Sequence, residues 1–168
     1  LAEPTEIMLV IDTSDSMKRE VLPGLPRMEA ITDAANKLAT ELLKHETVKL
    51  GIVTFSTSDN FGTISDAKLK SALTSSSSDI TSIIDSSTYD GNGQTNIDAG
   101  VTLASQNFSD TCENKYIILL TDGVPNYSIG KPTFEYSGTT ATNTKNKLEK
   151  IKTDEKINLI SVMTGVES

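Results

Sequence analysis

Four short apolar runs recur along the chain, each with the length of a strand and the composition of one buried on both faces. They span Ile7–Ile11, Leu50–Phe55, Tyr116–Leu120 and Ile157–Met163. Strands of a parallel sheet read in this continuous way because helices cover both of its faces. The runs therefore predict four buried, parallel strands.

Helical periodicity appears between these strands. The first helix has apolar residues at three- and four-residue steps on one face, namely Met28, Ile31, Ala35, Leu38 and Leu42. A second helix is predicted over Ile97–Phe108, with Asn96 placed to cap its start, and a weaker third over Thr144–Thr153. Alternating strands and helices predict an α/β fold with a doubly wound, open, mostly parallel sheet and helices on both faces.

Smaller elements are predicted after the second strand and at the end of the chain. We expect Asn60–Ile64 to form an antiparallel edge strand, and Asp66–Leu73 and Asp79–Asp85 to hold helical turns. The sequence stops at Ser168, shortly after the last predicted strand and with no helix to cover it. We therefore expect a C-terminal truncation, with a further helix and strand beyond this chain or on another one.

Composition narrows the function. The 168 residues predict one domain, and the formal charge of −8 disfavours binding to nucleic acid or to an anionic membrane surface. Trp is absent and aromatic residues make up only 5%, so a stacking platform for single-stranded nucleic acid is not expected. The single cysteine, Cys112, excludes an intrachain disulfide, and no apolar run is long enough to insert into a membrane.

Several polar segments lie where parallel sheets of this kind bind their ligands, at the carboxyl ends of the strands. The segments are Asp12–Ser16 after the first strand, Thr121–Gly123 after the third and Gly91–Asn96 before the second helix. They offer carboxylates and hydroxyls but no imidazole or thiolate, which suits Mg²⁺, Mn²⁺ or Ca²⁺ rather than Zn²⁺ or Cu²⁺. Neutral hydroxyls leave excess positive charge on a cation, which can then attract an acidic oxygen from a partner.

The same segments resemble the von Willebrand factor type A domain family. Asp12–Ser16 fits the D-x-S-x-S signature, Gly93–Gly100 matches the threonine loop and the helix after it, and Leu119–Gly123 matches the third motif. The three motifs occur in the family's order and the resemblance covers essentially residues 1–168. It implies one Rossmann-like type A domain that lacks the family's final helix and strand elements.

The resemblance also implies a metal-ion-dependent adhesion site. By position, the hydroxyl ligands are Ser14, Ser16 and Thr95, and the carboxylates are Asp12 and Asp122. Mg²⁺ is the expected cation, with Mn²⁺ and Ca²⁺ as alternatives, and the partner would supply an Asp or Glu. The family commonly has Gly where this chain has Asp15, whose carboxylate would either point to solvent or strengthen cation attraction.

Two loops are expected to form a rim around this site and to select the partner. Residues 17–26 contribute Leu22 and Leu25, and residues 124–143 contribute Tyr127, Phe134 and Tyr136. The second loop is longer than most ordered connections, and loops of that length are often functional. Asp98 and the lone His45 are instead expected to have structural or surface roles.

Catalysis is not expected. Haloacid-dehalogenase-type phosphatases have a D-x-D motif after the first strand, but here Ser14 takes the place of the second aspartate. The sequence also contains neither a G-x-S-x-G nucleophile elbow nor a phosphate-binding glycine loop. One binding hypothesis is an extracellular adhesin, such as a Gram-positive pilus tip, anchored to the cell wall by parts outside this chain and binding host matrix or cell-surface protein. The other is an intracellular module serving a chaperone-like or metal-insertion ATPase.

Overall fold

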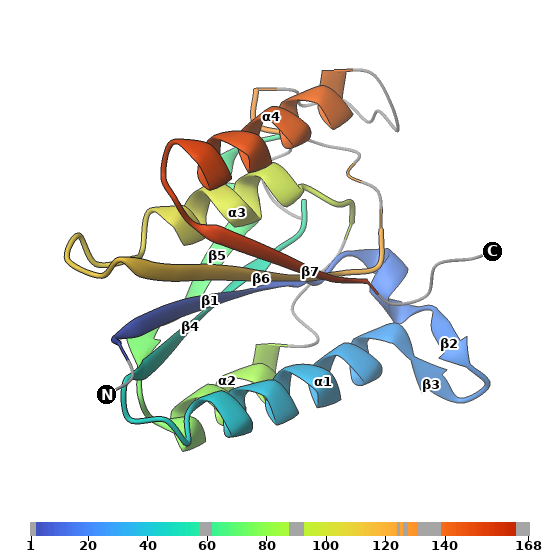
Figure 1. The fold of residues 1–168 in the computed structure, drawn as a ribbon. Coiled ribbons are helices and arrows are strands. Elements are labelled where there is room, and N and C mark those ends of the chain that lie inside the picture. The colour runs from blue at the N-terminus through green and yellow to red at the C-terminus, as the bar shows by residue number, and fades with distance from the viewer. Residues whose placement is uncertain are drawn as a thin grey trace.

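The computed structural model shows a five-stranded sheet between two pairs of helices (Figure 1). It describes residues 3–57, 62–87, 93–123, 125, 128–130 and 139–163. The strands are β1 Thr5–Asp12, β2 Glu20–Leu22, β3 Leu25–Pro26, β4 Val48–Phe55, β5 Ala67–Thr74, β6 Asn114–Thr121 and β7 Asn158–Met163. The α-helices are α1 Arg27–Leu42, α2 Ser77–Ser87, α3 Ile97–Ser105 and α4 Thr139–Thr153, and two 3₁₀ turns, η1 and η2, span Asp15–Lys18 and Ile64–Asp66.

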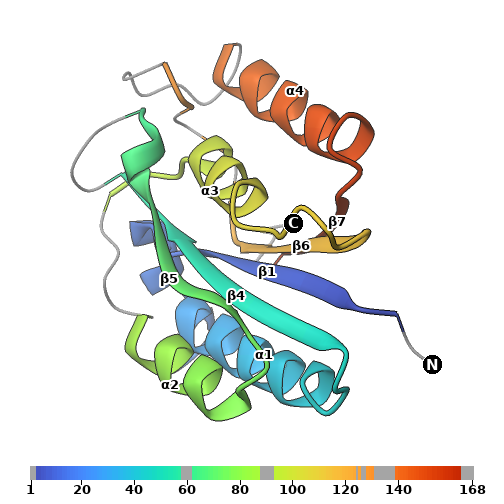
Figure 2. The same cartoon turned by 90° about the vertical axis from the view of Figure 1, so that its left-hand side faces the viewer.

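The sheet has the order β5-β4-β1-β6-β7. Strand β1 pairs in parallel with β4 and β6, and β6 pairs in parallel with β7, whereas β5 is antiparallel to β4. Helices α1 and α2 cover one face, and α3 and α4 cover the other (Figures 1 and 2). The predicted doubly wound, mostly parallel α/β fold is therefore confirmed.

Alternation along β1 divides the core into two layers. Ile7, Leu9 and Ile11 belong to the cluster that packs against α1 and α2, while Met8 and Val10 belong to the cluster on the α3 side. All five side chains are buried, which explains why the strand reads as one continuous apolar run.

The register of β1 aligns the carboxyl ends of the central strands. Ile11 pairs with Leu120 on one side, and Asp12 pairs with Phe55 on the other. The residues that directly follow β1 and β6 therefore leave the sheet at the same edge. This alignment brings together segments that are more than a hundred residues apart in the sequence.

The predicted antiparallel edge strand was placed too early. Asn60 lies outside the described residues, and Gly62–Asp66 forms a turn and then η2, whereas the edge strand is β5 over Ala67–Thr74. A capping box between Thr63 and Asp66 begins the 3₁₀ turn, so the polar residues here cap a turn instead of extending a strand. The helical turns predicted over Asp66–Leu73 were wrong, because an exposed edge tolerates polar residues such as Lys68.

The other predicted helices are confirmed with shifted ends. Residues 79–85 lie inside α2, and α4 begins at Thr139, five residues before its predicted start. Helix α3 ends at Ser105, three residues early, where Asn107 Nδ2 donates to the carbonyl of Leu103 at 2.7 Å. In the described part of the chain, none of the helices is long and apolar enough to cross a membrane.

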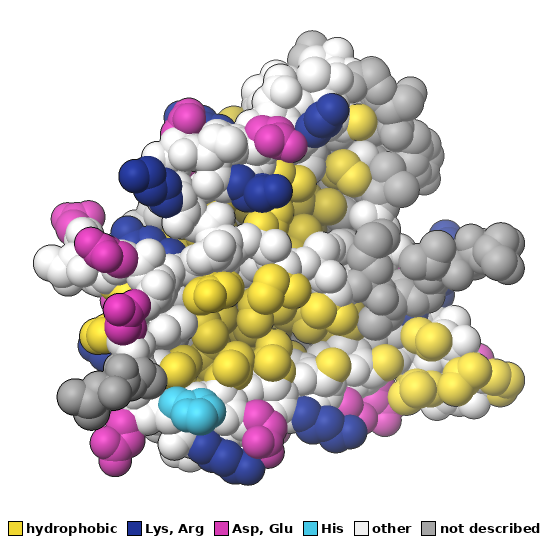
Figure 3. Space-filling view, viewed as in Figure 1, with side chains coloured by type: hydrophobic (Ala, Val, Ile, Leu, Met, Phe, Trp, Pro, Cys, Tyr) yellow, Lys and Arg dark blue, Asp and Glu magenta, His cyan; other side chains and the backbone are white. Residues whose placement is uncertain are grey.

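The β7 end of the sheet leaves apolar side chains exposed on its α1 side. Ile160 is 46% exposed, and Val162 and Tyr116 are only partly buried. Figure 3 shows apolar side chains gathered over β7 and along α1. Helices α1 and α2 therefore cover the β4 and β1 side of this face more completely than the β7 side.

Gly100 permits the close approach of α3 to the sheet. A Cβ atom there would lie 2.7 Å from Phe55 Cδ1 and 3.0 Å from Val10 Cγ1. Gly100→Ala should therefore lower the free energy of unfolding by about 1–3 kcal/mol, measured by urea denaturation. Gly123→Ala is the control, because its added Cβ meets no atom within 4 Å, and it should change stability by less than about 0.5 kcal/mol. Equal stability of Gly100→Ala and wild type would contradict this account of the packing.

Candidate metal centre

Four of the five predicted site residues form one chain of polar contacts. Thr95 Oγ1 donates to Ser14 Oγ at 3.2 Å, and Ser14 Oγ lies 3.0 Å from Ser16 Oγ. Ser16 Oγ in turn donates to Asp122 Oδ1 at 2.9 Å. The three hydroxyls come from the loop after β1 and the turn before α3, and the carboxylate comes from the end of β6. The structure therefore brings together residues that the sequence placed in three separate motifs.

Asp12 completes the cluster from the end of β1. Its Oδ1 accepts the backbone N–H of Ser14 at 2.9 Å, and its Oδ2 accepts the hydroxyl of Thr121 at 2.6 Å. The residue has no solvent exposure. Burial raises the pKa of the Asp12 carboxyl from 3.8 to about 6, although the hydrogen bonds from Ser14 and Thr121 act in the opposite direction. A charged Asp12 therefore lowers the stability of the fold when no cation is bound.

Asp122 has a cationic neighbour that the sequence analysis did not find. Arg27, the first residue of α1, places Nη1 2.9 Å from Asp122 Oδ2, and both side chains are buried. Because Ser16 occupies the other oxygen, the two oxygens of Asp122 have different partners. Only the pattern of helix α1 was visible in the sequence, and nothing in it showed that this arginine points toward β6.

Asp15 joins the signature loop to the threonine loop. Its backbone N–H donates to the carbonyl of Gly93, and the N–H of Gly93 donates to Asp15 Oδ2, both at 2.9 Å. The second oxygen accepts from Lys18 at 2.7 Å. Gly93 has φ +86°, and an added Cβ would lie 3.1 Å from Thr57 Oγ1. The Asp15 carboxylate thus binds the opposite loop, a role that neither sequence alternative included.

Another buried carboxylate, that of Asp66, holds the residue next to Thr95. Asn96 Oδ1 accepts the N–H of Ala99 at 3.1 Å, which confirms the predicted cap of α3. Asn96 Nδ2 donates to Asp66 Oδ2 at 2.7 Å, and that oxygen also accepts the N–H of Gly62 at 2.8 Å. Asp66 therefore fixes the turn that carries Thr95. Sequence analysis missed it because Asp66 precedes an edge strand instead of following a central one.

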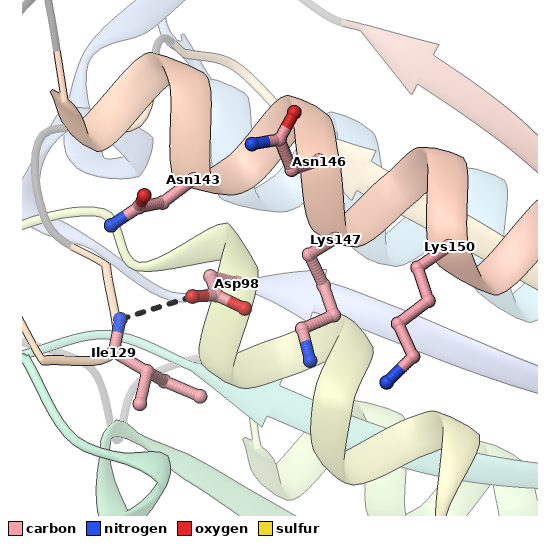
Figure 4. A pocket seen from close by; sticks show the side chains of 6 residues that line it. All are labelled: Asp98, Ile129, Asn143, Asn146, Lys147 and Lys150. Carbon is pink, nitrogen blue, oxygen red and sulfur yellow. Dashed lines mark hydrogen bonds between the residues drawn. The ribbon is translucent and has the colours of Figure 1, made fainter.

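Asp98 contributes to packing between α3 and the segment after β6. Its Oδ2 accepts the N–H of Ile129 at 3.1 Å, and its Oδ1 accepts the Thr102 hydroxyl at 3.2 Å. These contacts agree with the structural role expected from the sequence. Asp98, Lys147 and Lys150 line a pocket of about 410 Å³. Figure 4 shows these side chains, with the two lysines on α4.

Two of the five predicted rim residues lie in the described structure. Leu22 and Leu25 belong to the β2–β3 hairpin, where Leu22 is 61% exposed and Leu25 is partly buried. Figure 3 shows apolar side chains at this hairpin. Tyr127, Phe134 and Tyr136 lie outside the described residues.

The donor set has few charged groups. Within the described residues, no three His, Cys, Asp or Glu side chains gather closely enough to hold a metal ion. Two carboxylates and three hydroxyls nevertheless lie in one contact network. Hydroxyl and carboxylate oxygens are ligands for hard divalent cations, so the chemistry of these residues fits Mg²⁺ or a similar ion.

Comparison with known families now identifies the domain. The model of the von Willebrand factor type A domain matches residues 7–124. The chain belongs to the von Willebrand factor type A domain family. The matched part of this type A domain contains Asp12, Ser14, Ser16, Thr95 and Asp122. No curated protein matches it in a sequence comparison.

Solved structures with the type A fold include pilus proteins. Pilus adhesin SpaC from Lactobacillus rhamnosus GG is 22% identical with a TM-score of 0.70, over 95% of this chain and 24% of that chain. The PilB minor pilin from Streptococcus sanguinis is 18% identical with a TM-score of 0.69, over 96% and 51%. The hypothetical protein BatB from Bacteroides thetaiotaomicron is 15% identical with a TM-score of 0.59, over 95% and 91%. This chain therefore spans about half the length of PilB and about a quarter of the length of SpaC. At these identities the similarities show the fold.

The raised pKa of Asp12 predicts that its charge destabilises the cation-free type A domain. Because the pKa in the fold lies above 3.8, protonated Asp12 favours folding, and this contribution is lost as pH rises through about 6. Asp12→Asn should therefore raise the free energy of unfolding at pH 7.5 by about 3 kcal/mol in EDTA, measured by urea denaturation. The gain should be mostly lost at pH 4 and absent below about pH 3, where Asp12 is protonated in both states.

Asp15→Asn is the matched control for this measurement. Its hydrogen bonds from Lys18 and Gly93 lower the pKa of the Asp15 carboxyl, so removing that charge should give no gain in stability at neutral pH. A gain for Asp12→Asn of the same size at pH 4 and pH 7.5 would show that its charge is not the cause.

Proposed function

We propose that this domain binds a divalent cation through Asp12, Ser14, Ser16, Thr95 and Asp122, and that it uses the cation to bind an acidic side chain of a protein partner. Mg²⁺ is the proposed cation, with Mn²⁺ and Ca²⁺ as alternatives. The observation that supports this most is the unbroken contact network from Thr95 through the two serines to Asp122.

The chemistry of the ligands supports capture of a carboxylate. Three of the five proposed ligands are neutral hydroxyls, so only Asp12 and Asp122 oppose the charge of a divalent cation, and Asp122 is already paired with Arg27. When bound, the cation supplies a positive charge that attracts an anionic oxygen. Ser14, Ser16 and Thr95 would orient its coordination, and Asp12 and Asp122 would hold it at the edge of the sheet. An Asp or Glu from a partner matches this requirement.

A binding role is favoured over an enzymatic one. The lone His45 lies just after α1, and its carbonyl accepts the backbone N–H of Val48. It is near the start of β1, because the N–H of Thr5 donates to the carbonyl of Thr47. The proposed cation site is at the other end of β1, after Asp12. Among the described residues, the site thus contains no imidazole or thiol that could act as a general base or a nucleophile.

We further propose that the domain is an extracellular adhesin, part of a pilus or other surface protein that is anchored to the cell wall by segments outside this chain. The fold likeness to SpaC and PilB supports this proposal. Its proposed ligand is a host matrix or cell-surface protein. The exposed Leu22 of the β2–β3 hairpin would contact an apolar residue of that ligand.

The alternative is a module that serves an intracellular ATPase, and the same cation site would suit it. Fractionation of the native host cells separates the two proposals. Antibody detection in the cell-wall fraction would support the adhesin, whereas recovery in the cytoplasm together with an ATPase would support the alternative.

Isothermal titration with Mg²⁺ tests the cation site directly. The EDTA-stripped, dialysed protein should bind one equivalent, and Asp12→Asn and Thr95→Val should each weaken binding by more than about 100-fold, because both remove a proposed ligand. Asp33→Asn is the control, since Asp33 is exposed on α1, and it should bind as wild type does. Retention of full affinity in Asp12→Asn, which is expected to be well folded, would contradict the assignment of these ligands.

Adhesion assays test the proposed use of the cation. Binding to immobilised extracellular-matrix proteins should require Mg²⁺ and be lost in EDTA or in Thr95→Val. Leu22→Ser should weaken this binding by about tenfold, as expected for an apolar contact at an interface, while leaving the Mg²⁺ affinity unchanged. Adhesion that persists in EDTA would rule out a cation-bridged contact.

A further inference from the structure

The buried Arg27–Asp122 pair places a permanent positive charge at the proposed cation site. Arg27 Nη1 lies 2.9 Å from Asp122 Oδ2, and the two side chains are 8% and 0% exposed. An ion pair this well buried is screened little by water, so its charge acts on neighbouring groups. The arginine is therefore part of the electrostatics of the site and not a surface residue near it.

The geometry assigns separate oxygens of Asp122 to the guanidinium and to the hydroxyl network. Oδ2 accepts from Arg27, whereas Oδ1 accepts from Ser16 at 2.9 Å. Oδ1 is thus the oxygen on the side of the proposed ligands. Arg27 bonds the oxygen that does not take part in the hydroxyl network. Oδ1 could therefore contact a cation while Oδ2 stays paired with Arg27.

The fold holds Arg27 in place through its backbone as well. Its N–H donates to the carbonyl of Arg19 at 2.7 Å, which closes the base of the β2–β3 hairpin. Arg27 is also the first residue of α1, where the helix dipole does not favour a cation. A positive side chain at this unfavourable helix position indicates that its contact with Asp122 outweighs the local cost.

Counting charges shows what the arginine changes. Asp12 and Asp122 together with Arg27 leave one negative charge, and Asp15 is paired with Lys18. A divalent cation would then give the site one net positive charge, which one carboxylate neutralises. Without Arg27 the loaded site would be neutral, and a carboxylate ligand would lose that attraction.

From these contacts we infer that Arg27 sets the charge of the site, weakening the binding of the cation and strengthening the binding of a singly charged carboxylate ligand. The inference rests on the proposed function. It names a residue that touches neither the proposed cation nor the partner, and that acts through Asp122. A residue with only a structural role would affect cation binding in the opposite direction.

The test measures Mg²⁺ affinity by isothermal titration for wild type, Arg27→Gln and Arg27→Lys. Arg27→Gln removes the charge but retains a donor for Asp122, so it should bind Mg²⁺ at least about tenfold more tightly, because a repelling charge is gone. Arg27→Lys retains the charge and should stay within about threefold of wild type. Unchanged or weaker binding in Arg27→Gln would overturn the inference.

Thermal unfolding with and without Mg²⁺ provides a second readout. Removing the arginine leaves a buried carboxylate without its counter-charge, so the Tm of Arg27→Gln should fall in EDTA and rise more than that of wild type when Mg²⁺ is added. If the variant is unfolded in EDTA, recovery of its circular dichroism signal in Mg²⁺ supports the inference, and failure to recover contradicts it.

Failure of the inference and failure of the proposed function give different results. If wild type binds Mg²⁺ and Arg27→Gln binds no more tightly, only the role of Arg27 is wrong. If neither protein binds Mg²⁺, the cation site is wrong and this inference falls with it. If only Arg27→Gln binds, the arginine excludes the cation, so its charge role holds while the proposed function of the wild-type chain fails.

Discussion

The burial of two carboxylates at the ends of neighbouring strands is the constraint on which the rest of the site depends. Asp12 and Asp122 leave the sheet from β1 and β6 with little or no access to water. Buried charges are tolerated only when polar groups surround them. The hydroxyls of Ser16 and Thr121, the N–H of Ser14 and the guanidinium of Arg27 meet this requirement. Asp12 is still costly to bury in its charged form despite these partners, since burial raises its pKa to about 6.

The apolar core of the parallel sheet offsets the energetic cost of burying these polar groups. Residues along the body of β1 are buried in two apolar layers, which supply most of the stabilisation through removal of apolar surface from water. The polar segments begin only where Ile11 and Leu120 end their pairing. The apolar layers of the core and the polar residues of the candidate site thus occupy different parts of each strand.

The sequence predicted the four parallel strands, the sheet type and the five oxygen-bearing residues that the fold brings together, because each rests on a local pattern. Apolar runs mark buried strands, and short polar motifs directly follow them. Edge strand β5 was misplaced because Lys68 and its neighbours alternate weakly and face solvent, so that periodicity gave little signal. Arg27 and Asp66 were missed for a different reason. Their partners, Asp122 and Asn96, are distant in sequence, and only the folded arrangement shows which charges meet.

The reciprocal bonds between Asp15 and Gly93 have a thermodynamic consequence. The two residues lie 78 positions apart, and joining them restricts both loops when the chain folds. The conformational entropy of the threonine loop is therefore lost during folding, and little remains to be lost on ligation. A glycine in place of Asp15 could keep the backbone bond but not the one from the side chain. The fold thus holds the oxygen cluster in place, and affinity for the proposed cation would depend on charge and desolvation more than on loop ordering.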